Sequence, residues 1–156
     1  MRRDLFDMQK IKIGIFYGST HHTTVKIVKH VSEVLNIESV YDVKNIDDVS
    51  IVSQYDWLVF FCPTYGDEEL QSDMEDFFQK QALVLTDKKF TICETGNYYG
   101  YDDFTFGARK ILEYEMEKHG CRQLYKNLSL DTLPRIDWEY LNEWLIGLKE
   151  YIQDER

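Results

Sequence analysis

Apolar, β-branched runs alternate along the chain with stretches in which apolar residues recur at the spacing of one helix face. The runs at 11–17, 39–41, 57–61 and 89–93 predict strands, and a last strand is expected within 121–130. The run at 57–61 is apolar at every position, which favours a strand that is covered on both faces.

Helical spacing of apolar residues predicts four helices, which run from Thr24 to Leu35, over 74–81, over 104–116 and over 138–152. Gly120 is expected directly after the third helix, and Asp137 is expected to cap the fourth. This alternation predicts the α/β class, as a three-layer α/β/α sandwich around a five-stranded parallel sheet. We interpret residues 1–10 as an N-terminal arm and 11–156 as a single domain.

Charge, apolar run length and cysteine spacing indicate which partners, compartment and metal sites to expect. The 156 residues include 28 acidic and 18 basic side chains, for a formal net charge of −10. This excess argues against nonspecific binding to nucleic acid or anionic membranes, and it favours partners with basic docking faces. No apolar run has the length of a signal peptide or membrane span, so we expect a cytoplasmic protein. Cys62, Cys93 and Cys121 are widely spaced, which predicts free, buried thiols and no metal site.

Three loops should meet at the carboxyl ends of the strands, where parallel sheets bind ligands. They cover 18–24, 63–73 and 95–103. The first loop is rich in hydroxyl groups and opens a helix, so its free N–H groups and the helix dipole suit a phosphate monoester. A simpler reading is that Thr23 or Thr24 only caps the helix.

The second and third loops carry tyrosines beside glycines. Tyr65 is followed by Gly66, a residue that lets a peptide change orientation without steric cost. Tyr98 and Tyr101 lie in the third loop, and two tyrosines on opposite sides of a crevice would clamp a flat ring. Surface tyrosines are also common in loops that bind nothing.

Together these loops resemble those of the flavodoxins. Residues 13–24 resemble the family's first strand and phosphate loop, 63–73 its second flavin loop, and 95–101 its third. The resemblance covers nearly the whole chain from Lys10, in order and spacing. No insertion of about twenty residues interrupts the last strand, so the chain resembles the short-chain members.

The resemblance implies one noncovalent FMN and a monomeric, low-potential one-electron carrier between redox proteins, which uses the semiquinone/hydroquinone couple and is not an enzyme. The 5′-phosphate would lie on residues 19–24, the isoalloxazine between Tyr65 and Tyr101, and the pyrimidine edge near Gly96 and Asn97. The implied cofactor-binding residues are Ser19, Thr20, His21, His22, Thr23, Thr24, Pro63, Thr64, Tyr65, Gly66, Thr95, Gly96, Asn97, Tyr98 and Tyr101.

Two features would favour a strongly reducing carrier. The Gly66 carbonyl could turn to accept a hydrogen bond from flavin N5 after one-electron reduction. Segments 64–78 and 94–106 contain several acidic residues and no Lys or Arg, so their charge would disfavour the anion that a second electron creates. The same acidic residues could also form only a solvated face.

The phosphate loop departs from the family pattern, because this chain has His21-His22-Thr23-Thr24 where flavodoxins usually carry Thr-Gly-Asn-Thr, and the glycine is lost. We hypothesise that at least one of these histidines contacts the phosphate. A receiver domain shares the strand–helix pattern but needs acidic residues where this chain has Gly18 and Pro63. A flavodoxin-like protein dedicated to one partner enzyme, and a flavin-free binding module of the same fold, stay open as alternatives.

Overall fold

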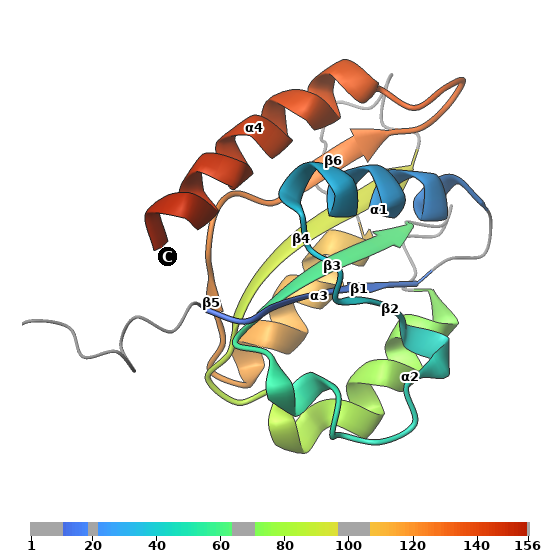
Figure 1. The fold of residues 1–156 in the computed structure, drawn as a ribbon. Coiled ribbons are helices and arrows are strands. Elements are labelled where there is room, and N and C mark those ends of the chain that lie inside the picture. The colour runs from blue at the N-terminus through green and yellow to red at the C-terminus, as the bar shows by residue number, and fades with distance from the viewer. Residues whose placement is uncertain (1–10, 19–21, 64–70, 97–106, 156) are drawn as a thin grey trace, which may run out of the picture.

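A parallel sheet separates two helical layers in this computed structural model, which describes residues 11–18, 22–63, 71–96 and 107–155 (Figure 1). The strands are β1 (Ile13–Tyr17), β2 (Val40–Asp42), β3 (Trp57–Pro63), β4 (Lys89–Gly96), β5 (Arg122–Gln123) and β6 (Leu128–Asp131). The helices are α1 (His22–Leu35), α2 (Ser72–Gln81), α3 (Gly107–Lys118) and α4 (Trp138–Glu155), with short 3-10 turns at Val43–Asn45, Val52–Gln54 and Ala82–Val84.

The strands follow the order β2-β1-β3-β4-β5. β5 pairs with the first residues of β4, and β6 pairs with the last residues of the same strand. Every strand pair is parallel. The chain leaves β1 toward one edge of the sheet to form β2, then returns past β1 to form β3. The order therefore reverses between β1 and β3, and a crevice for ligands is expected there, at the carboxyl ends of the strands.

Each face of the sheet has its own apolar core. On one face α1 and α4 pack over the sheet, with Ile27 of α1 and Leu145 of α4 in the same buried cluster. On the other face Phe77 of α2 and Leu112 of α3 belong to a second cluster. Residues 57–62 of β3 are fully buried, so the prediction of a strand covered on both faces is confirmed. The predicted α/β/α sandwich is confirmed as well.

The last strand expected within 121–130 is present, but it is divided into β5 and β6, which share the fifth strand position. In the gap, Tyr125 adopts a positive φ of 66°. The side-chain Oδ1 of Asn127 accepts a hydrogen bond from the Ile92 N–H of β4 at 2.8 Å. The Asn127 side chain thus accepts the hydrogen bond that a strand backbone would accept at this point. Because β5 and β6 both pair with β4, the six strands occupy five positions across the sheet.

Several predicted strand limits shift by one to three residues. The first strand begins at Ile13 and not at residue 11, because the Lys12 N–H donates to the Asp56 carboxylate at 3.1 Å instead of joining a strand ladder. The second covers Val40–Asp42, one residue later than expected. β3 continues to Pro63 and β4 to Gly96, so both reach further toward the candidate loops than their apolar runs indicated.

Helix ends also differ from the apolar pattern, because polar residues form the first turns. α1 begins at His22 and α2 at Ser72, two residues earlier than predicted, while the predicted start of the third helix falls outside the described residues. The expected helix signals are confirmed. Gly120 has φ +78° two residues after Lys118, the last residue of α3, and its N–H donates to the Glu117 carbonyl, so it closes the last turn. The Asp137 carboxylate accepts a hydrogen bond from the Tyr140 N–H at the start of α4.

Candidate functional site

Three strand ends lie together at one edge of the sheet. The Gly18 N–H donates to the Phe61 carbonyl at 3.0 Å, which continues the pairing of β1 with β3 by one residue. Pro63 at the end of β3 is paired with Thr95, and Gly96 follows as the last residue of β4. The three loops proposed from the sequence therefore leave neighbouring strands at the same edge.

The structure describes six of the predicted cofactor-binding residues: His22, Thr23, Thr24, Pro63, Thr95 and Gly96. The first three form the opening turn of α1, and the other three lie at the ends of β3 and β4. The remaining nine lie outside the described residues: Ser19, Thr20, His21, Thr64, Tyr65, Gly66, Asn97, Tyr98 and Tyr101.

The start of α1 is suited to an anion. Its first turn contains no acidic residue, and backbone N–H groups at the start of a helix have no partner within the helix. The Thr24 side chain is buried, with 3% exposed, whereas His22 is exposed. Lys26 and Lys29 follow on the exposed part of the helix. The helix dipole and these cations make this end attractive to a phosphate group.

Gln71 links the first candidate loop to the end of the second. Its buried side chain accepts a hydrogen bond from the Met74 N–H at 3.0 Å, which caps α2, and donates to the Asp73 carboxylate at 2.9 Å. A Cβ built on Gly18 would clash with Gln71 Oε1. Only a glycine lets this amide lie against the backbone at the end of β1. Sequence reasoning missed this role, because nothing local pairs Gly18 with Gln71.

The thiols near this edge are inert. Cys62 and Cys93 are buried at the ends of β3 and β4 and free, as predicted, and so is Cys121. Burial raises the pKa of Cys62 to about 12, and burial followed by the nearby Glu94 charge raises the pKa of Cys93. Both thiols therefore stay protonated at neutral pH and are poor nucleophiles.

A buried carboxyl group lies near the end of β4, two residues before Gly96. Glu94, with 0% exposed, accepts hydrogen bonds from the Arg109 N–H at 3.1 Å and from the Ser129 hydroxyl. Its one signal in the sequence is that Glu94 interrupts a mostly apolar run just before Thr95 and Gly96.

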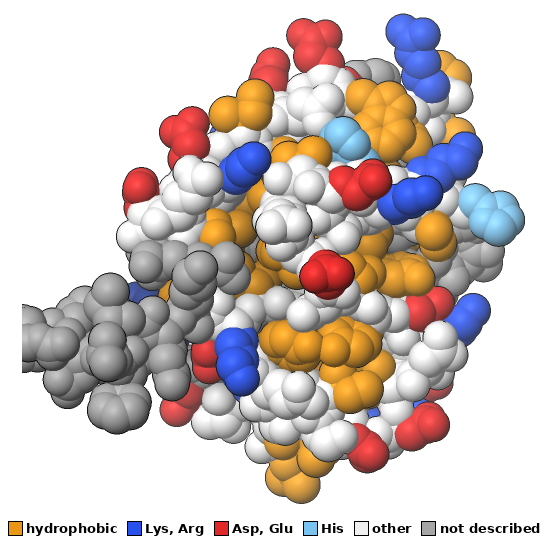
Figure 2. Space-filling model, in the orientation of Figure 1, with side chains coloured by type: hydrophobic (Ala, Val, Ile, Leu, Met, Phe, Trp, Pro, Cys, Tyr) orange, Lys and Arg blue, Asp and Glu red, His pale blue; other side chains and the backbone are white. Residues whose placement is uncertain are grey.

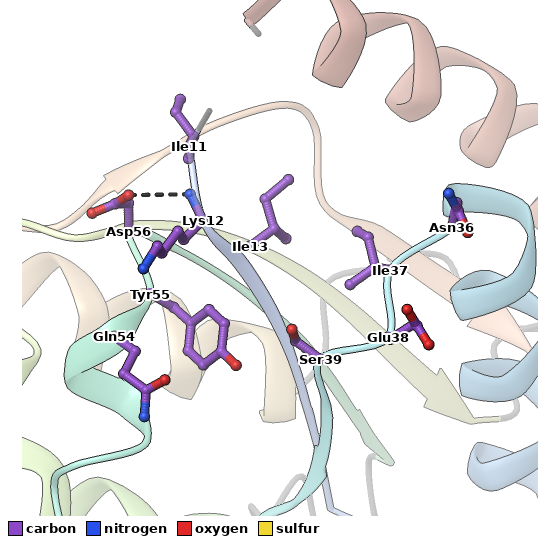
Figure 3. A pocket seen from close by; sticks show the side chains of 10 residues that line it. All are labelled: Ile11, Lys12, Ile13, Asn36, Ile37, Glu38, Ser39, Gln54, Tyr55 and Asp56. Atoms are coloured by element: carbon purple, nitrogen blue, oxygen red, sulfur yellow. Dashed lines mark hydrogen bonds between the residues drawn. The ribbon is translucent and has the colours of Figure 1, made fainter. Parts of the chain in front are cut away.

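The opposite end of the sheet, at the amino ends of the strands, carries a polar hollow of about 940 Å³ (Figure 3). Lys12 and Asp56 border it at the amino ends of β1 and β3, with Glu38 and Ser39 facing them from the segment before β2. Ligands of doubly wound sheets bind at the carboxyl ends of the strands, so this hollow is on the wrong side for that site.

Neither a membrane-spanning helix nor a metal-binding group of side chains occurs within the described ranges. None of the described helices is long and apolar enough to cross a bilayer. No three His, Cys, Asp or Glu side chains of this part of the chain lie in an arrangement that could hold a metal ion.

Comparison with known proteins gives consistent results. The family model for flavodoxin matches residues 15–144. The flavodoxin of Synechococcus elongatus is 33% identical over 114 residues, which cover 71% of this chain and 67% of that protein. The flavodoxin of Maridesulfovibrio salexigens is 32% identical over 147 residues, which cover 88% of this chain and 97% of that protein.

Solved structures share the fold at lower sequence identity. Oxidised flavodoxin 1 from Bacillus cereus superposes with a TM-score of 0.73 at 20% identity, covering 93% of this chain and 99% of that one. A Fusobacterium nucleatum flavodoxin bound to flavin mononucleotide superposes with a TM-score of 0.70 at 20% identity, covering 91% of this chain and 95% of that one. These likenesses confirm the expected fold.

Proposed function

The chain belongs to the flavodoxin family, and from that premise we propose that it binds one FMN noncovalently and passes single electrons between redox proteins. Flavodoxins are electron-transfer proteins, so the chain is a carrier and does not convert a substrate. The observation that carries the proposal is the meeting of Gly18, Pro63 and Gly96 at one edge of the sheet. Each leads into a segment that resembles a flavin loop.

The phosphate of FMN fits the opening turn of α1. Backbone N–H groups there, with the hydroxyls of Ser19 and Thr24, would bind its oxygens, and no acidic residue of that turn repels them. The exposed position of His22 leaves its imidazole free to reach an anion, which supports the hypothesis that a histidine contacts the phosphate.

The ring system fits between the second and third loops. Tyr65 and Tyr101 would stack on its two faces, and main-chain groups of Gly96 and Asn97 would meet its pyrimidine edge. When bound, FMN supplies the one-electron chemistry. The residues of this chain bind it, orient it and hold water away from it.

The finer properties of the carrier follow from charge and thiol chemistry. A net charge of −10 favours redox partners whose docking faces are basic. The three free, buried cysteines suit a reducing compartment, which supports placing the carrier in the cytoplasm. We expect a monomer, since a carrier must expose its cofactor edge to successive partners.

Titration of FMN fluorescence with the apoprotein tests the cofactor assignment. We expect one FMN per chain and quenched fluorescence, with riboflavin binding more weakly because it lacks the phosphate. A His21→Ala/His22→Ala pair tests the histidine contact, and it should lose more affinity at pH 6 than at pH 8 because imidazole is more often charged there. Failure of FMN to bind would leave a flavin-free binding module, whereas unchanged affinity of the double variant at both pH values would remove only the histidine contact.

A further inference from the structure

Glu94 is an unusual side chain for its position. It lies two residues before the end of β4, where it is flanked in the sheet by Cys62 of β3 and Ser129 of β6. Among the described residues the buried acids are Glu94 and Asp131, and Glu94 is the more buried, with 0% exposed against 5%. A carboxyl group in such a place costs free energy unless hydrogen bonds compensate for its lost hydration.

Both carboxyl oxygens of Glu94 accept hydrogen bonds. Oε1 accepts from the Arg109 N–H at 3.1 Å, and Oε2 accepts from the Ser129 hydroxyl. Ser129 Oγ in turn accepts from Arg109 Nη1 at 3.3 Å, which completes a small ring of contacts. Both oxygens thus receive donors, and the amino end of α3 adds its positive dipole. These donors can compensate a negative charge on Glu94 at this buried position.

These contacts tie together the two ends of the third candidate loop. Gly96 is the last residue of β4, and Gly107 is the first of α3. Glu94 holds α3 through the backbone of Arg109 and holds β6 through Ser129. Glu94 therefore adds a polar link to the apolar packing of α3 on β4, and the two together fix the start and end of that loop.

We propose that Glu94 is a positioning residue of the electron-transfer site, which holds the two ends of the third flavin loop, at Gly96 and Gly107, and fixes one buried negative charge close to them. The inference rests on the proposed function. Electrons arrive from a partner redox protein, and the second adds one negative charge at the site. A fixed carboxylate nearby disfavours that charge, and burial lets it act with less screening than an acid at the surface.

Glu94→Gln separates this role from a purely structural one. Gln keeps the length and most of the hydrogen bonds of Glu while it removes the charge. Glu113→Gln is the matched control, because Glu113 lies on the same helix and also contacts Arg109, at 3.1 Å from Nε, but is partly exposed. We would load each protein with FMN and measure both one-electron potentials by anaerobic titration with dithionite.

We expect Glu94→Gln to favour uptake of the second electron about tenfold, a rise of about 59 mV, with a much smaller change for the first electron. Glu113→Gln should leave both potentials at the wild-type values. Equal shifts in the two variants, or no shift in Glu94→Gln, would overturn the proposal. Wild-type protein that binds no FMN would instead overturn the proposed function.

Glu94→Asp keeps the proposal testable if Glu94→Gln does not fold. The shorter side chain retains the charge but cannot reach both Arg109 N and Ser129 Oγ. We expect the folded variant to bind FMN and riboflavin about fivefold or more weakly than wild type, by the same factor for both, because the phosphate contacts are untouched. Wild-type affinity for both flavins would contradict a positioning role.

Discussion

Gly18 shows how one residue can connect two loops. The absence of a side chain at Gly18 leaves space for the amide of Gln71, and that amide caps α2 through the Met74 N–H. The chain leaves β1 at Gly18 toward the first loop and enters α2 at Gln71 from the second. One close contact therefore joins the end of β1 to the start of α2.

Gly18→Ala should destabilise the protein by about 1 kcal/mol, because the new methyl group displaces Gln71 and removes the helix cap. Urea unfolding of the apoprotein measures this cost. In a Gln71→Ala background the same change should cost much less, since the clashing amide is gone. Equal costs in the two backgrounds would show that the clash with Gln71 is not the cause.

Cys62 makes stability depend on pH in the alkaline range. Burial raises the pKa of its thiol from 9.0 to about 12, so between these values the unfolded chain loses a proton that the folded chain keeps. The unfolded state then binds fewer protons, and the free energy of unfolding falls as pH rises above about 9, by at most about 1.4 kcal/mol per pH unit from this group.

Cys62→Ser removes that dependence, because a serine hydroxyl does not titrate in this range. We expect the variant to be less stable than wild type at pH 8 and the gap between them to narrow by pH 10, as measured by urea unfolding. A gap that stays constant between pH 8 and pH 10 would mean that the folded thiol titrates normally.

At the scale of elements, the fifth strand position depends on Asn127. Its Oδ1 accepts from the Ile92 N–H at 2.8 Å, and its Nδ2 donates to the Glu113 carboxylate at 2.7 Å. One side chain thus joins β4, the gap between β5 and β6, and α3. The interruption of the strand is stabilised by a hydrogen bond equivalent to the one that a regular strand would make.

Asn127→Ala should cost about 2 kcal/mol of unfolding free energy, because it leaves the Ile92 N–H buried without a partner in the middle of β4. Asn142→Ala is the control. It also removes an amide that makes a side-chain hydrogen bond, to His30 at 2.7 Å, but on the exposed surface of α4, where the cost should stay within about 0.5 kcal/mol. Similar costs for the two variants would contradict the role of Asn127.

Local patterns predicted the elements but not the contacts that join them. The alternation of apolar runs with helical spacing was sufficient to predict the three layers. Gly120 and Asp137 marked the ends of two helices, because capping depends only on residues a few positions away. The split of the fifth strand and the anchoring of Glu94 each depend on residues 35 positions apart. A single sequence contains no signal that pairs such distant residues, so these features appear only in the fold.

At the scale of the whole molecule, the charge distribution bears on the choice of partner. The net charge is −10, and Figure 2 shows acidic side chains spread over the visible face with Lys and Arg among them. No single acidic patch dominates this view. The excess of negative charge would attract a basic protein at long range, whatever the shape of the contact.

Electron transfer from the reduced protein to a basic acceptor such as cytochrome c should slow as ionic strength rises, because salt screens the attraction between unlike charges. Stopped-flow rates between 10 and about 300 mM salt should fall roughly tenfold or more. Ferricyanide, an anionic acceptor, is the control and should react faster at high salt. A rate with cytochrome c that is independent of salt would argue against partners with basic docking faces.

Stepwise anaerobic reduction of the FMN-loaded protein, followed by absorbance, tests the central claim most directly. A carrier of single electrons should show a long-wavelength band of the neutral, one-electron-reduced flavin that rises during the first half of the titration and decays during the second. Direct bleaching without that band would contradict the account, because it would identify a flavoprotein that takes up its two electrons together.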